Sequence, residues 1–324
     1  MSFIGATARY WFTLRYLKPV QFYGRVWFRL YRPHLAAPDG DLPLRLSHGT
    51  WQVAAARLPC MLGPLRFRFL NHTHALASQG GWDDSALEKL WLYNLHYFDD
   101  LNARDTQQRG LWHRALIERW LLENPPAQGN GWEPYPTTLR IVNWVKWLQA
   151  GNPPVPGMVQ SLATQASLLC KSLERHLLGN HLFANAKALV FAGLCFDVPE
   201  ASDWLATGLN IIARELPEQV LADGGNFERS PMYHAIFLED VLDLINAGNH
   251  WLGCVSPDVL AQWRDVASKM LVWLTVARRA MGWGLRVCVN EALPHTARCR
   301  WRGLIHPRCG ADSEWRAVPT RLIW

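Results

Sequence analysis

The chain has 324 residues, of which 49% are hydrophobic, and this is enough apolar material for one large core. No run of about twenty uncharged apolar residues occurs, so we expect no integral membrane segment. The seven cysteines are scattered without a CxxC spacing, which predicts neither a zinc site nor a disulfide framework. We therefore expect no metal and no cofactor.

The net charge of +6 does not predict a nucleic-acid partner, because the charge is unevenly distributed. From Ala277 to the end there are nine arginines, no lysine and three acidic residues, whereas the first 276 residues hold 24 basic and 24 acidic residues. The excess positive charge belongs to the tail alone.

Residues 1–80 are predicted to be an N-terminal segment with short helices and a small β element. The alternating run LRFRFL at 65–70 is typical of a strand or a hairpin edge. At the N-terminus, Arg9, Arg15 and Lys18 interrupt any apolar stretch, so no cleavable signal peptide is visible. A cytoplasmic location is compatible with this.

From residue 84 onward, apolar residues recur at steps of three and four, and breakers rich in glycine and proline separate the segments. The fold class is therefore mainly α, with a helical domain at 81–276. The pattern predicts helices at 84–104, 107–124, 136–150, 158–178, 181–196, 200–222, 231–246 and 256–276.

Three of these helices are expected to begin on one rim. Consecutive helices joined by short connections pack antiparallel, so the helices starting near 136, 181 and 231 run the same way. Their leading loops, GWEPYP, LLGNH and GGNFERSP, are polar and aromatic. Aligned helix N-termini favour an anionic ligand.

Two of these helix starts carry residues suited to chemistry. Asn180 is a preferred helix cap, but Asn180 and His181 can also hydrogen-bond a carboxylate and stabilise charge beside it. Ser230 and Pro231 read as the cap and first residue of a helix, which places Tyr233 and His234 in its first turn. Tyr233 is either a packed aromatic residue or a proton-transfer group.

Other residues near the rim have a structural and a functional interpretation. Glu228 and Arg229 form either a surface pair of little energetic value or part of a binding loop. Arg140 either extends along apolar surface or binds a carboxylate. Trp132 and Tyr135 belong to the core or offer faces on which sugar rings stack.

Taken together, four stretches resemble the heparinase II/III-like family of polysaccharide lyases, which includes heparin-sulfate lyases and oligoalginate lyases. They are LWLYNLHYFDDL, GWEPYPTTLRIVNW, HLLGNHLFANAKALVFAG and ADGGNFERSPMYH. The resemblance implies an incomplete (α/α) toroid of antiparallel helix pairs, followed in complete members by a β-sandwich. It also implies β-elimination at a uronic acid of an anionic polysaccharide or oligosaccharide, without water or metal at the reacting centre.

The resemblance assigns roles to individual residues. Residues 180–181 match the Asn-His pair that neutralises the substrate carboxylate. Tyr233 matches the catalytic tyrosine, acting as base, acid or both, and His234 matches a neighbouring active-site histidine. Residues 228–229 lie in the same loop and are expected to bind or orient substrate.

The tail departs from the family. Residues 277–324 are rich in arginine, cysteine and tryptophan and have no helical or strand period. This composition is typical of an out-of-frame reading of GC-rich DNA. We hypothesise a frameshift near codon 277, which removes the sandwich and impairs activity.

Two alternatives remain open at this stage. One is an (α/α) glycoside hydrolase, for which Glu133 and Glu228 are the rim carboxylates. The other is a non-catalytic protein for carbohydrate binding or assembly. The sequence does not predict which uronate glycan is bound, endo or exo action, or the oligomeric state, and the family's frequent periplasmic location leaves localisation open.

Overall fold

The computed structural model describes residues 11–12, 14–15, 17–31, 33, 40, 42–52 and 57–280, with the backbone alone for 278–280. The predicted frameshifted tail therefore lies almost wholly outside the described residues. The division at residue 80 remains a proposal.

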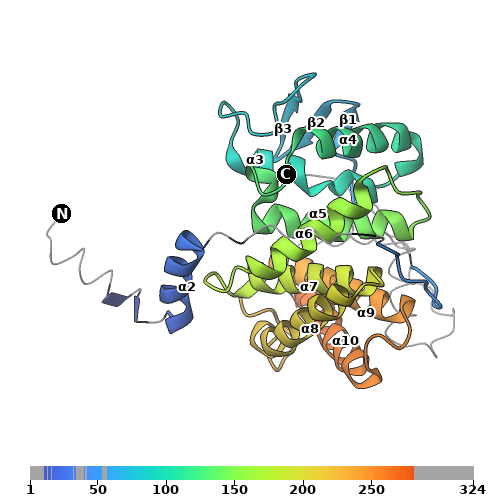
Figure 1. Ribbon diagram of the computed structural model, residues 1–324. Coiled ribbons are helices and arrows are strands. Elements are labelled where there is room, and N and C mark those ends of the chain that lie inside the picture. Colours follow the sequence, from blue (N-terminus) through green and yellow to red (C-terminus); the bar gives the residue numbers. More distant parts are fainter. Residues whose placement is uncertain are drawn as a thin grey trace, which may run out of the picture.

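The described part of the chain is mainly helical, as predicted (Figure 1). A short helix and a three-stranded antiparallel sheet precede the helical region. The elements are α2 (Pro19–Leu30), β1 (Met61–Gly63), β2 (Arg66–Phe69), β3 (His72–Ala75), α3 (Lys89–Tyr97), η1 (Asp99–Asn102), η2 (Thr106–Arg109), α4 (Gly110–Glu123), η3 (Asn130–Trp132), α5 (Pro134–Gln149), α6 (Met158–Lys171), α7 (Gly179–Cys195), α8 (Pro199–Gln219), α9 (Pro231–His250) and α10 (Pro257–Ala280).

Each predicted helix exists, and two of them end seven residues before the predicted position. The helix predicted at 84–104 ends at Tyr97, because Phe98 takes a left-handed conformation with φ 62° and a 3-10 turn follows. The helix predicted at 158–178 ends at Lys171. The strand expected in LRFRFL is β2, in which Phe67 and Phe69 are buried and the arginines between them are exposed.

Helix α7 lies at the centre of the helical region, and every residue from Leu182 to Cys195 is buried. It runs antiparallel to α8, and glycines allow the two helices to approach closely. A Cβ on Gly193 would lie 2.7 Å from the Ala201 carbonyl oxygen, and one on Gly208 would lie 2.7 Å from that of Ala186. Such close backbone approach leaves no room for a side chain.

Helices α5, α7 and α9 lie side by side and run in the same direction. Asn185 of α7 donates to Thr138 Oγ1 of α5 at 2.9 Å. Phe183 of α7 packs on Phe237 of α9, with ring centroids 4.2 Å apart. Both contacts lie within two turns of the helix starts, so the three N-termini share one rim, as the alternation of antiparallel helices predicted.

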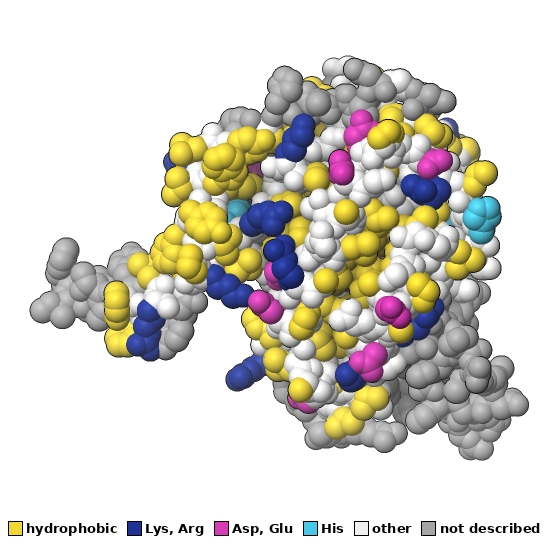
Figure 2. Space-filling view, turned by 60° about the horizontal axis from the view of Figure 1, so that its bottom comes forward, with side chains coloured by type: hydrophobic (Ala, Val, Ile, Leu, Met, Phe, Trp, Pro, Cys, Tyr) yellow, Lys and Arg dark blue, Asp and Glu magenta, His cyan; other side chains and the backbone are white. Residues whose placement is uncertain are grey.

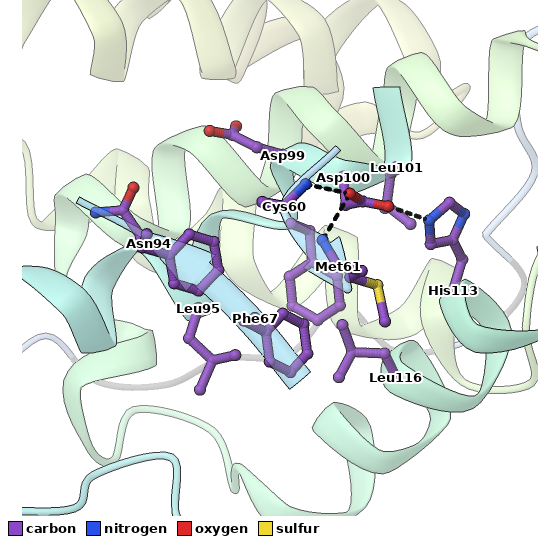
Figure 3. A pocket seen from close by; sticks show the side chains of 12 residues that line it. Cys60, Met61, Phe67, Asn94, Leu95, Asp99, Asp100, Leu101, His113 and Leu116 are labelled. Atoms are coloured by element: carbon purple, nitrogen blue, oxygen red, sulfur yellow. Dashed lines mark hydrogen bonds and ion pairs between the residues drawn. The ribbon is translucent and has the colours of Figure 1, made fainter. Parts of the chain in front are cut away.

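A buried carboxylate joins the small sheet to the helical region (Figure 3). Asp100 accepts hydrogen bonds from the backbone N–H groups of Cys60 and Met61, from Arg109 Nε at 2.6 Å and from His113 Nε2 at 2.8 Å. Burial alone raises the pKa of Asp100, but the hydrogen bonds led by His113 outweigh it and hold the pKa at about 2.

The described residues include neither a membrane-spanning helix nor a cluster of metal-binding side chains. No helix there is long and apolar enough to cross a membrane. No three histidine, cysteine, aspartate or glutamate side chains there gather as they would around a metal ion. The four described cysteines are free thiols.

Candidate active site on the rim of helices α5, α7 and α9

The start of α7 is built differently from the capped start that the sequence suggested. Its cap position is Leu178, which makes no side-chain cap hydrogen bond, and Asn180 lies inside the first turn. Leu178 has φ 60° and ψ −163°, a backbone region almost restricted to glycine. The capping interpretation of Asn180 is therefore wrong, and its amide is not used as a cap.

His181 lies beside Asn180 with 41% of its side chain exposed, and a buried carboxylate holds it from behind. Its Nδ1 is 3.2 Å from Glu174 Oε1, and the Glu174 side chain is 8% exposed. Because a carboxylate only accepts, Nδ1 carries the proton and Nε2 is left for another partner.

Glu174 is itself fixed on both sides by Asn185. The Asn185 amide donates to Glu174 Oε2 at 3.0 Å, and its oxygen accepts from the Glu174 backbone N–H at 2.9 Å. Glu174 was not among the residues predicted from the sequence, and it lies in the short connection before α7. Its one signal is a carboxylate seven residues before a candidate histidine, and that spacing carries no regular pattern.

Tyrosines line the rim next to His181. Tyr135 lies under the His181 ring with centroids 4.4 Å apart and meets Tyr97 edge-on at 6.0 Å. Burial raises the pKa of Tyr135 to about 12, so it is a neutral phenol at neutral pH. The predicted place of Tyr135 at the rim agrees with the structure. Nearby, the Tyr93 hydroxyl donates to Glu133, which also pairs with Lys89 at 2.8 Å.

The start of α9 agrees with its predicted cap. Ser230 is the cap residue, its hydroxyl accepts from the Tyr233 backbone N–H at 3.5 Å, and Pro231 is the first helical residue. Tyr233 is 37% exposed. Glu228 and Arg229 precede it and are also exposed, and Arg229 has a left-handed φ of 56°.

The expected catalytic role of His234 needs correction. It is fully buried and stacks on Trp273 of α10 at 4.5 Å. Its Nδ1 accepts from the Asn226 backbone N–H at 3.2 Å, and its Nε2 therefore donates to the Met270 carbonyl oxygen at 3.0 Å. With both nitrogens occupied away from solvent, His234 ties the loop before α9 to α10.

Arg140 and Trp132, expected to bind substrate, are also structural. Arg140 is fully buried, with its guanidinium 3.9 Å from the Trp120 ring centroid and its Nε donating to Gln165 at 2.9 Å. Trp132 is 6% exposed and donates its indole N–H to the Asn124 carbonyl oxygen. Neither side chain presents a free surface to a sugar.

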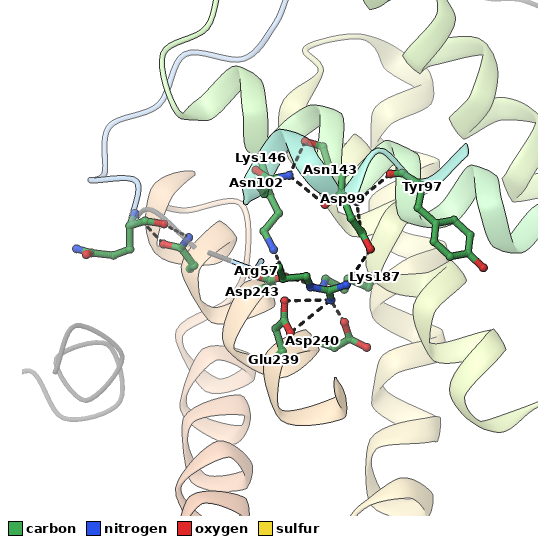
Figure 4. A network of polar contacts seen from close by, with 12 residues as sticks. Arg57, Tyr97, Asp99, Asn102, Asn143, Lys146, Lys187, Glu239, Asp240 and Asp243 are labelled. Atoms are coloured by element: carbon green, nitrogen blue, oxygen red, sulfur yellow. Dashed lines mark hydrogen bonds and ion pairs between the residues drawn. The ribbon is translucent and has the colours of Figure 1, made fainter. Parts of the chain in front are cut away.

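A network of charged residues lies between the three rim helices (Figure 4). Asp243 of α9 accepts from Lys146 of α5 and from Lys187 of α7, both at 2.6 Å, and Lys187 also donates to Asp240. Burial alone lowers the pKa of Lys187, but Asp240 and Asp243 outweigh it and raise that pKa. The network ties the three helices to one another.

The structure thus brings Asn180, His181, Glu174 and Tyr135 together, while Tyr233 lies at the next helix start on the same rim. Among the described residues, no direct hydrogen bond joins Tyr233 to any of these four side chains. The arrangement offers an amide and an imidazole at one helix start and the exposed phenol of Tyr233 at another on the same rim. Its chemistry suits an anionic ligand and proton transfer.

The fold is that of a helical toroid-like domain. The chain aligns with the crystal structure of heparan sulfate lyase HepC from Pedobacter heparinus with a TM-score of 0.50, 18% identity and coverage of 79% of this chain and 43% of that one. It also aligns with a crystal structure of heparinase III, with a TM-score of 0.50, 20% identity and coverage of 76% of this chain and 42% of that one. At this identity the likeness shows the fold.

Part of the sequence is similar to a known family. Residues 157–256 match the family described as Heparinase II/III N-terminus. The chain is 32% identical over 96 residues to a heparin-sulfate lyase of Bacteroides stercoris, covering 29% of this chain and 14% of that protein. It is 41% identical over 64 residues to a heparin-sulfate lyase of Pedobacter heparinus, covering 19% of this chain and 9% of that protein. This chain carries a heparinase II/III-like N-terminal portion and spans less than half the length of these relatives.

Proposed function

We propose that the rim binds an anionic polysaccharide containing uronic acid and that the protein cleaves it as a lyase, by β-elimination. The observation that carries this proposal is the shared rim, where Asn180 and His181 open α7 and a half-exposed Tyr233 opens α9. The names of the similar heparin-sulfate lyases support the reaction class.

In the proposed reaction, the uronate carboxylate lies against the start of α7. Hydrogen bonds from Asn180 and His181, with the positive end of the helix, stabilise the negative charge that develops there. Tyr233 reacts as the tyrosinate, whose oxygen takes the proton from the carbon next to the carboxylate and becomes the phenol. The electron pair forms a C=C bond, the C–O bond at the β carbon breaks, and the tyrosine proton passes to the leaving oxygen.

Three other residues support this chemistry in the proposal. Glu174 fixes the His181 imidazole so that Nε2 faces the ligand. Exposed Glu228 and Arg229 orient the chain of sugars beside Tyr233.

Tyr233→Phe tests the proposal. The full chain is incubated separately with heparan sulfate, alginate and chondroitin, and the near-ultraviolet absorbance of the new double bond is followed. We expect product from at least one glycan, a loss of roughly a hundredfold or more in Tyr233→Phe, and unchanged glycan affinity. Tyr23→Phe, which alters an exposed tyrosine on α2, serves as the control and should keep full activity.

The same assay separates the alternatives. Glycan affinity without product in either protein would sink the lyase proposal and leave a binding protein. New reducing ends without absorbance would indicate a hydrolase. The structure gives the hydrolase little support, because the Glu133 carboxylate is already engaged by Lys89 and Tyr93.

A further inference from the structure

Helix α2 exposes an apolar surface to solvent. Two adjacent rows of the helix, spaced by four residues, carry large hydrophobic side chains on one side. Among the described residues of α2, none is buried. The exposed fractions are 44% for Phe22, 64% for Tyr23, 59% for Val26, 62% for Trp27 and 74% for Leu30.

The helix docks on the body through a different row. A Cβ on Gly24 would lie 3.0 Å from the His176 side chain, and the Phe28 ring lies 4.5 Å from the His176 ring. Lys18 pairs with Glu218 at 2.6 Å. An amphipathic helix normally turns its apolar stripe to the core. Here the docking row faces the body, and the apolar rows remain outside.

The positive charge of this segment indicates which kind of partner binds the apolar rows of α2. The first 38 residues contain six arginines or lysines and no acidic residue. Arg25 and Arg29 are exposed and form the row next to Phe22 and Val26. Figure 2 shows hydrophobic and basic side chains next to each other on the part of the molecule that projects from the body.

We propose that α2 binds the surface of an anionic phospholipid bilayer. A helix with aromatic and aliphatic side chains on one side and cations beside them lies in the plane of the membrane interface, with its apolar side among the acyl chains. With 12 residues, α2 is about 18 Å long, shorter than the roughly 30 Å hydrocarbon core, so it lies on the membrane and does not cross it.

The side chains favour a lipid surface over a soluble polyanion. A polysaccharide needs the arginines and stacks on aromatic rings, but it gains nothing from the exposed aliphatic side chains of Val26 and Leu30. The proposal stands independently of the proposed function.

Vesicle sedimentation tests the proposal with the full chain. Vesicles of phosphatidylcholine alone are compared with vesicles that also contain phosphatidylglycerol. We expect binding to the anionic vesicles, a loss of roughly tenfold in the double variant Trp27→Asp, Leu30→Asp, and a smaller loss in Arg25→Gln, Arg29→Gln. About 1 M salt should weaken wild-type binding without abolishing it.

Leu122→Asp is the matched control, because Leu122 is 85% exposed on α4, away from α2. It should bind vesicles as the wild type does, and circular dichroism should show that every variant folds. The proposal is overturned if the wild type does not sediment with anionic vesicles, or if Leu122→Asp loses as much binding. It is also overturned if the double variant binds vesicles as the wild type does. A double variant that still binds vesicles but is converted from a dimer to a monomer, as measured by gel filtration, would show instead that α2 contacts a second copy of the chain.

Discussion

At the scale of single residues, partners decide what each rim group can do. Asn180 and His181 lie next to each other in the chain, yet His181 owes its orientation to Glu174 and its stacking partner to Tyr135 of another helix. Residue type and helix position indicated Asn180 and His181 as candidate site residues. The partners of His181, Glu174 and Tyr135, come from other parts of the sequence.

Glu174→Gln should release His181 from its fixed tautomer. In the variant the side-chain oxygen still accepts from the Asn185 amide, so the new NH₂ group faces His181 Nδ1 and that ring nitrogen loses its acceptor. Imidazole ¹⁵N chemical shifts should report an Nδ1-protonated ring in the wild type and a mixture in the variant. Turnover of any glycan substrate should fall by about tenfold.

Glu118→Gln on the exposed side of α4 is the control for that experiment and should change neither measurement. Equal ¹⁵N shifts in Glu174→Gln and the wild type would remove Glu174 from the site.

At the scale of elements, the close packing of α7 on α8 positions the rim, because α7 carries Asn180 and His181 at its start. Gly208 marks a close approach of α8 to α7, where an added Cβ would meet the Ala186 carbonyl oxygen at 2.7 Å and Val190 Cγ2 at 2.8 Å. A backbone oxygen cannot turn away as a side chain does, so the helices must separate.

Gly208→Ala should therefore lower the free energy of unfolding by about 1–3 kcal/mol, despite the better helix propensity of alanine. Gly110→Ala is the matched control, because nothing lies within 4 Å of the added Cβ at the start of α4. It should be neutral or slightly stabilising. Urea midpoints of the two variants test this, and an unchanged midpoint for Gly208→Ala would contradict the packing argument.

At the scale of the whole molecule, several histidines are buried as neutral groups. His96 accepts from Trp120 Nε1 at 3.0 Å and donates to the Trp82 carbonyl oxygen at 3.2 Å. Burial, with the nearby Arg140, lowers the pKa of His96 to about 3. Burial also lowers the pKa values of His234 and His250.

Stability should consequently fall as the pH drops. Between the unfolded pKa of about 6.5 and the folded pKa of His96, the unfolded chain binds more protons than the folded protein. At about pH 4.5 the loss from His96 alone is about 2–3 kcal/mol relative to pH 7. Urea unfolding at both pH values measures it, and His96→Gln, which keeps a donor and an acceptor, should show a smaller pH dependence.

The sequence by itself determined the helices, the strand β2 and the shared rim. Apolar spacing and breakers are local properties, and a chain of antiparallel neighbours puts alternate helix starts on one side. The cap at Ser230 was also predicted, because a cap involves residues within one turn.

Only the tertiary structure decided which polar side chains reach solvent. His234 is covered by Trp273 of α10, and Arg140 is enclosed by Trp120 of α4, so two residues with suitable chemistry are structural. Glu174 gained its place beside His181 through a short connection without regular pattern. Burial and hydrogen-bond partners depend on elements distant in the sequence, so the local spacing of apolar residues does not predict them.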